Sequence, residues 1–105
     1  MNDETIPDVV QQFAERYPDV WNAYNQLGEA AGKFGPLDSK TQRLIKLGIA
    51  IGAARQGAVN SHARRALKEG ITPDELRQTA VLGITTVGWP AAFSSFCWIE
   101  ENLED

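Results

Sequence analysis

The sequence contains a single cysteine, Cys97, and a single histidine, His62, and this scarcity limits its chemistry. One cysteine cannot form an internal disulfide bond, which suits a reducing compartment and excludes a disulfide framework. No cysteine, second histidine or acid stands at metal-ligand spacing around His62, so we expect no metal site. We also expect no cofactor.

Long apolar runs and basic stretches are missing as well. The most apolar stretch, residues 44–54, is interrupted by Lys46 and is far shorter than the roughly 20 residues that span a bilayer. The acidic first four residues are followed by no apolar segment, which argues against a signal peptide. Ten basic against fourteen acidic residues give a net charge of −4 without a basic patch. We therefore expect a cytoplasmic protein with no membrane and no nucleic-acid partner.

The 105 residues fit one domain, residues 1–105, and the composition of 43% hydrophobic and 23% charged residues is that of a globular protein. Apolar residues recur at helical spacing along the whole chain, and no segment alternates polar and apolar residues as a strand does. The pattern predicts a compact all-α fold.

Turn and capping residues divide this pattern into about six helices. Thr5 can cap the first helix, Gly70 can end the fourth, and Thr72 with Glu75 forms a capping box at the start of the fifth. Residues 56–58 are expected to form a short corner. The expected helices cover residues 5–17, 18–31, 38–54, 60–70, 72–87 and the segment that follows Pro90.

The third of these helices is apolar nearly all round, which is typical of a buried central helix. It contains Gly48 and Gly52, four positions apart, and each costs about 1 kcal/mol relative to alanine. Close packing of another helix would compensate. Part of the apolar surface of so short a chain is expected to be covered in an oligomer.

Residues 62–76, HARRALKEGITPDEL, resemble the signature of the carboxymuconolactone decarboxylase family. Residues 37–45 are similar to the start of that family's central helix, and residues 87–92 to its Gly-x-Pro-Ala-Ala corner. The resemblance covers about residues 37–96, in order, and leaves residues 1–36 as N-terminal helices that match least.

The resemblance implies an alkylhydroperoxidase-D-like helical subunit that forms a ring-like homo-oligomer, a trimer or a hexamer. The family includes decarboxylases and a peroxidase branch that uses a Cys-x-x-Cys pair with a nearby glutamate and histidine. Counted back from His62, the two cysteine positions hold Arg55 and Ala58, and the glutamate position holds Arg43. One chain therefore cannot run the thiol cycle, whereas decarboxylase members also lack the cysteine pair.

His62 is the expected catalytic residue. At the start of a helix its imidazole would be neutral, and a neutral ring can act as a general base or a hydrogen-bond donor near pH 7. The alternative is a histidine that caps its helix or packs at a subunit contact.

Three further residues are expected at the site. Arg55, with either Arg64 or Arg65, would hold a substrate carboxylate, and Trp89 would line the pocket. The alternatives are solvated arginines that pair with nearby glutamates and a tryptophan that fills an interface. Cys97 is expected to be a small buried residue.

These residues support two functions. One is a cofactor-independent decarboxylase, or a related lyase or isomerase, that acts on a small anionic organic acid or lactone. The other is a non-catalytic helical binding or assembly module. Peroxidase activity is disfavoured by the missing cysteines. A concave pocket that contains His62 and an arginine would favour the enzyme.

Overall fold

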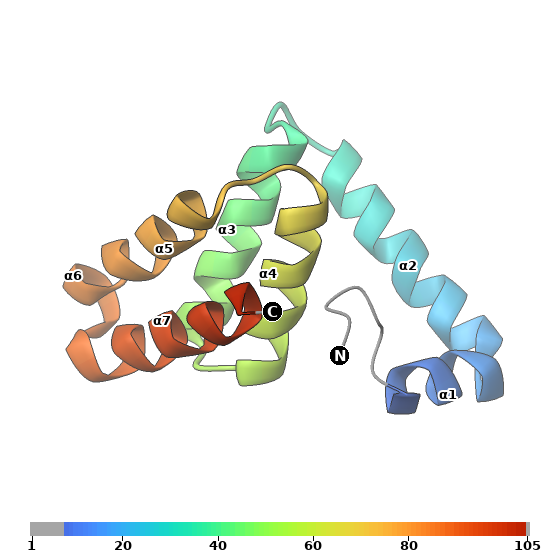
Figure 1. Ribbon diagram of the computed structural model, residues 1–105. Coiled ribbons are helices and arrows are strands. Elements are labelled where there is room, and N and C mark those ends of the chain that lie inside the picture. The colour runs from blue at the N-terminus through green and yellow to red at the C-terminus, as the bar shows by residue number, and fades with distance from the viewer. Residues whose placement is uncertain (1–7, 105) are drawn as a thin grey trace. The chain divides into compact units, whose positions relative to one another are not determined.

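The computed structural model describes residues 8–104, and every regular element within them is a helix (Figure 1). The expected all-α fold is confirmed. No helix in this part of the chain is long and apolar enough to cross a membrane. The helices are α1 (Asp8–Arg16), α2 (Pro18–Lys33), α3 (Ser39–Gly52), α4 (Gln56–Lys68), α5 (Pro73–Leu82), α6 (Ile84–Val87) and α7 (Trp89–Leu103).

Contacts divide the chain into two compact units, Met1–Leu37 with α1 and α2, and Asp38–Asp105 with α3 to α7. That residues 1–105 form one domain stays a prediction.

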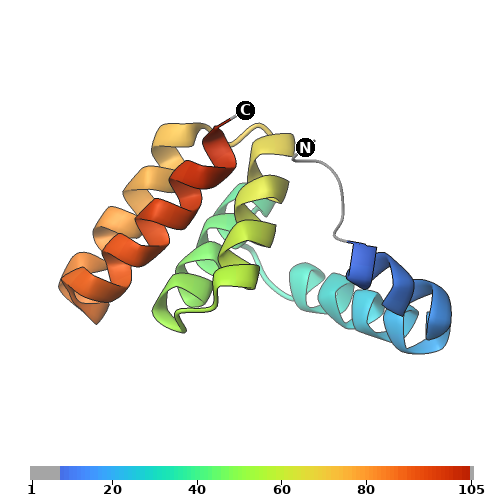
Figure 2. The same ribbon diagram turned by 60° about the horizontal axis from the view of Figure 1, so that its bottom comes forward.

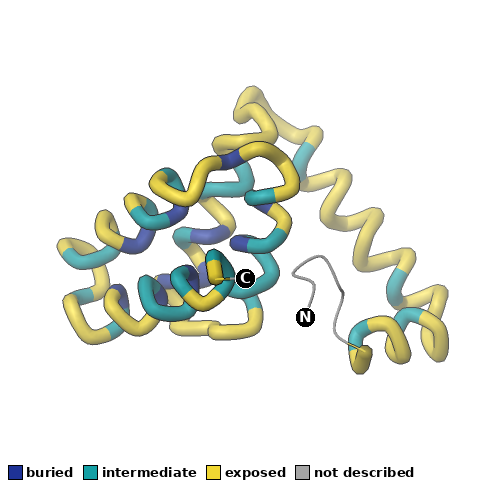
Figure 3. The backbone as a smooth tube through the Cα atoms, in the orientation of Figure 1, coloured by how far each residue is buried: buried dark blue, intermediate teal, exposed yellow. Residues whose placement is uncertain are grey.

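In the second unit, α3 packs against α4 and α5 packs against α7, and these two pairs meet through α7 (Figures 1 and 2). The core lies between the pairs, where the inner sides of the helices are buried (Figure 3). Arg77 ties α5 to α7 through a 2.6 Å bond from its Nε to Glu100. The buried apolar residues are Leu47, Ala50, Ile51, Val59, Ala63, Ala66, Ile71, Leu76, Ala80, Ala92 and Ile99.

Several helix ends confirm the sequence-based predictions. The Asp38 carboxylate caps α3 by accepting the backbone N–H of Thr41 at 2.8 Å. The Thr72–Glu75 capping box is present at the start of α5, and Gly70 follows α4 with φ of 89°, a conformation that favours glycine. The expected cap at Thr5 lies outside the described residues.

Two boundaries differ from the prediction. Helix α4 begins at Gln56, so residues 56–58 are its first turn and no corner; the chain reverses instead at Ala54, whose φ is 55°. The expected helix 72–87 breaks at Gly83, where an added Cβ would lie 3.1 Å from the carbonyl oxygen of Ala80. That Cβ would also lie 3.6 Å from side-chain atoms of Ile51 and Ala92, so the break goes with the close approach of α3 and α7.

The first unit has no buried residue in either helix (Figure 3). Its aromatic side chains contact one another along one side, with ring centroids 5.1 Å apart for Phe13 and Tyr17 and 5.9 Å apart for Trp21 and Tyr24. Phe13 is still 42% exposed and Tyr24 61% exposed. This pair of helices therefore lacks a core of its own.

Candidate functional site

Arg43 of α3 joins His62 of α4 to Glu69, the residue that ends α4. Its Nη1 lies 2.8 Å from Nδ1 of His62. Its Nε and Nη2 donate to the two carboxylate oxygens of Glu69 at 3.0 and 2.9 Å. The guanidinium thus makes a bidentate ion pair with Glu69 on one side and contacts the imidazole on the other. These bonds leave the guanidinium little freedom to rotate.

The packing of α3 against α4 brings these side chains together. His62 and Glu69 are seven residues apart, about two helical turns, so they lie on the same side of α4. The side chain of Arg43 is 15% exposed and that of Glu69 is 43% exposed. His62 is half-buried. The site is therefore a polar link at the edge of the core.

The pKa of His62 is lowered from 6.5 to about 4, so its ring is neutral at pH 7. Burial is the largest cause, followed by the positive charges of Arg43, Arg65 and Lys46; Glu69 opposes them. Hydrogen bonds from Arg43 in turn lower the pKa of Glu69. The prediction that His62 begins its helix is wrong, because it lies inside α4, and its neutrality has these other causes.

The arginines predicted to bind substrate make no hydrogen bond to His62 within residues 8–104. Arg55 is exposed at the N-cap of α4, about 10 Å along the axis from His62. Arg64, two residues after His62, points about 160° away from it around the helix. Arg65, three residues after, lies on the same side. Of the two alternatives, helix geometry favours Arg65.

Trp89 opens α7 beside α6, away from α4 (Figures 1 and 2). It is 57% exposed and stacks on Phe93, with ring centroids 4.8 Å apart. It borders an apolar groove of about 210 Å³ that includes neither His62 nor an arginine. The groove is lined by Ala80, Val81, Ile84, Trp89, Ala92, Phe93 and Phe96.

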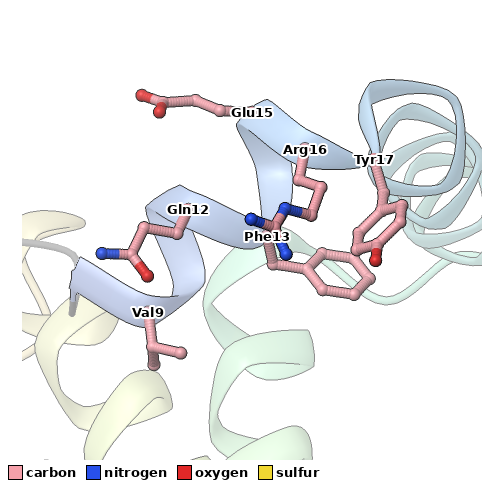
Figure 4. A pocket seen from close by; sticks show the side chains of 6 residues that line it. All are labelled: Val9, Gln12, Phe13, Glu15, Arg16 and Tyr17. Carbon is pink, nitrogen blue, oxygen red and sulfur yellow. The ribbon is translucent and has the colours of Figure 1, made fainter.

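Three other grooves also leave out His62. The largest, about 520 Å³, follows α1 (Figure 4). It is lined by one helix and the adjoining Tyr17, and Phe13, Arg16 and Tyr17 cluster at one end of it. Two grooves of about 290 and 380 Å³ lie between α3 and α5, and neither contains a histidine or a cysteine. Among residues 8–104, no three His, Cys, Asp or Glu side chains are grouped closely enough to hold a metal ion.

Sequence reasoning gave the alternative that the arginines pair with nearby glutamates, which Arg43 and Glu69 do, but it did not predict that this pair contacts His62. The one signal was that Arg43 occupies the position where the peroxidase branch has its glutamate. The contact itself joins residues 19 and 26 positions apart, which no local pattern encodes.

The fold and the site define a small helical protein with a histidine–arginine centre and a single cysteine. The chain belongs to the carboxymuconolactone decarboxylase family, which matches residues 18–101. The resemblance seen in the sequence is thereby confirmed, and it extends through α2.

Two relatives are similar to the chain. An uncharacterized protein of Methanocaldococcus jannaschii is 33% identical over 90 residues, which cover 85% of this chain and 86% of that protein. An uncharacterized protein of Haemophilus influenzae is 34% identical over 55 residues, which cover 52% of this chain and 49% of that protein.

Proposed function

We propose that the chain is a carboxymuconolactone decarboxylase-like lyase that removes CO₂ from a small organic acid or lactone without a cofactor. The observation that carries the proposal is the neutral, half-buried His62. It accepts a hydrogen bond from Arg43, and the positive charges of Lys46 and Arg65 also lie near it. A neutral imidazole among cations can interact with negative charge that develops on a substrate.

The reaction breaks the carbon–carbon bond to the carboxylate, and CO₂ leaves. The electron pair stays on the carbon and is delocalised onto a neighbouring carbonyl oxygen as an enolate. Water then protonates the carbon, and the hydroxide combines with CO₂ to give bicarbonate. His62 would stabilise the enolate oxygen, which needs only positioned donors.

The cations near His62 would attract the substrate carboxylate. Lys46 and Arg43 are three residues apart on α3, and Arg65 and His62 are three apart on α4, so each pair shares a side of its helix. Lys46 and Arg65 are exposed. We therefore assign carboxylate binding to these two residues, while the roles of Arg55, Arg64 and Trp89 stay predictions.

The test is release of CO₂ from carboxylated lactones and short β-keto acids by the wild-type chain and by His62→Ala. Arg64→Met tests the alternative in which Arg64 holds the carboxylate, because Arg64 points away from His62. We expect His62→Ala to lose at least tenfold in kcat/KM and Arg64→Met to lose little. Turnover that is unchanged in His62→Ala would remove His62 from the mechanism.

A second candidate function is a non-catalytic helical module. Arg43 already makes three hydrogen bonds to Glu69 and His62, and none of the four grooves described above includes His62. Both observations favour a structural link between α3 and α4. In that case His62→Ala would lower stability while no carboxylated substrate is turned over by either chain.

We further propose that the chain forms a homo-oligomer. In the second unit, one face exposes Ile45 (43%), Leu82 (63%) and Val87 (37%) over the two grooves between α3 and α5. The charged residue of these grooves, Glu75, is already paired with Lys40. An apolar face without an unpaired charge suits a second copy of the same face across a two-fold axis.

Gly48 and Gly52 lie on this face, and atoms added at their Cβ positions would come no closer than 3.9 and 3.8 Å to other side chains. These are ordinary van der Waals distances, so an alanine would fit at either position within the unit, and a second copy packed closely on this face would account for the glycines. In sedimentation experiments, Ile45→Glu should dissociate the oligomer, and Ser94→Glu, at an exposed position on α7, should not. A monomeric wild-type chain at tens of micromolar would overturn this proposal.

A further inference from the structure

We infer that Arg43 and Glu69 are positioning residues that hold His62 in one tautomer, with its proton on Nε2. This inference deepens the proposed function, because it states how His62 acts there. Arg43 donates a hydrogen bond to Nδ1 of His62, whereas a carboxylate at position 43 would accept one from it.

The chemistry of the donor requires this tautomer. A guanidinium has five N–H groups and no acceptor, and it does not lose its proton in proteins. At 2.8 Å from Nη1 of Arg43, Nδ1 of His62 must therefore accept the hydrogen bond with its lone pair. The ring is neutral when Nδ1 accepts, so the single proton resides on Nε2.

Glu69 fixes the donor. Its carboxylate accepts hydrogen bonds from Nε–H and Nη2–H of Arg43, which leaves Nη1 directed at the imidazole. The two hydrogen bonds to Glu69 fix the orientation of the guanidinium plane, and Nη1, at the edge of that plane, donates to the imidazole. Arg43 and Glu69 thus act through His62 and need not touch a substrate.

The tautomer decides what His62 can do. The Nδ1 lone pair is occupied, and Nε2 carries a hydrogen, so the ring has no lone pair with which to act as a general base. It can only donate Nε2–H to an acceptor such as a carboxylate, a carbonyl or an enolate oxygen. No hydrogen bond to Nε2 is present within residues 8–104. A carboxylate at position 43 would instead accept from Nδ1–H and leave the Nε2 lone pair available as a base.

The imidazole ¹⁵N signals test the inference directly. The full chain, expressed without a histidine tag, contains one histidine, so its long-range ¹H–¹⁵N correlation spectrum shows one ring. At pH 7 we expect Nε2 at the shift of a protonated nitrogen and Nδ1 at that of an unprotonated one. In Arg43→Met the two shifts should move toward each other as both tautomers become populated. In Arg43→Glu the assignment should reverse.

Two further variants complete the experiment. Arg64→Met removes an arginine of α4 that points away from His62, and it should leave the spectrum unchanged. Glu69→Gln keeps the side-chain shape, loses the ion pair, and should shift the ring signals less than Arg43→Met does. If Arg43→Glu does not fold, Arg43→Met alone decides.

A wild-type ring with Nδ1 protonated, or shifts that Arg43→Met leaves unchanged, would overturn the inference. The spectrum requires no substrate, so its outcome is separate from that of the decarboxylase test. The predicted tautomer without CO₂ release would contradict the proposed function alone. CO₂ release by a chain with the other tautomer would contradict this inference alone.

Discussion

The two units of this chain differ in how their apolar residues are used. In Asp38–Asp105, α3 to α7 enclose a core that includes Leu47, Leu76 and Ile99 with no exposed surface. In Met1–Leu37, the described helices bury no residue, and Val20, Tyr24 and Leu27 are 57–68% exposed. One unit has a core that can stabilise it, and the other has only an apolar surface.

The two units also differ in net charge. The first 37 residues contain six acidic and two basic residues, a net charge of −4, and the remaining residues contain eight of each. Two short helices without a core are marginally stable in water. The first unit therefore has no core to stabilise it, whereas the second contains both the core and the His62 site.

The largest difference between the units should appear on truncation of apolar side chains. Leu47→Ala, at a fully buried position, should lower the free energy of unfolding by about 2–5 kcal/mol, because it removes packing and leaves a cavity. Leu27→Ala, 68% exposed, should change it by about 0.5 kcal/mol or less. Urea denaturation, at a protein concentration too low for self-association, measures both free energies of unfolding. Equal losses would show that α2 shares the buried core.

We expect an effect of intermediate size on the free energy of unfolding when the pH is lowered, because His62 of the second unit becomes protonated. Its pKa is about 4 in the folded chain and 6.5 when unfolded, so the unfolded chain binds more protons between these values. Stability should be complete above pH 6.5 and fall as the pH drops toward 4, by about 2 kcal/mol or less for a half-exposed ring.

His62→Gln provides the comparison, because it removes the titration and keeps an amide of similar reach. The difference between the two stability curves should level off above pH 6.5 and slope between pH 4 and 6.5. A flat difference over that range would mean that folding does not perturb His62.

The smallest effect concerns the helix ends. Thr72 caps α5 through a reciprocal bond with Glu75, whereas Tyr17, at the N-cap of α2, makes no side-chain cap. Thr72→Ala should cost about 1 kcal/mol in thermal unfolding, and Thr72→Ser should restore most of it. Tyr17→Ala should leave the capping energy of α2 unaffected. A neutral Thr72→Ala would show that tertiary packing alone fixes the start of α5.

Local signals were sufficient for much of the fold. The start of α3 at Asp38 or Ser39, the capping box at Thr72 and the stop at Gly70 each depend on residues within one turn, and all are confirmed. The predicted start of α4 was wrong because the chain turns at Ala54, and alanine is not a residue type that indicates a turn. The break at Gly83 depends on the approach of α3 and α7, which is a tertiary effect.

The site was predicted less well for the same reason. His62 was identified because it is the chain's one histidine, and the family resemblance pointed to it. Its partners Arg43 and Glu69 come from another helix and from two turns away, so their contact requires the packed structure. Arg64 and Arg65 are adjacent in the sequence, and only the helical phase of α4 distinguishes them.

The pH titration of His62, followed through its ring protons by NMR in the tag-free chain, tests most directly whether burial, Arg43 and the other nearby cations keep this ring neutral. We predict one transition with a midpoint near pH 4 and an imidazole that is neutral at pH 7. Arg43→Met should raise that midpoint toward 6.5, because it removes one of the charges that lower the pKa. A wild-type midpoint near 6.5 would contradict the neutral, arginine-held histidine on which the proposed function depends.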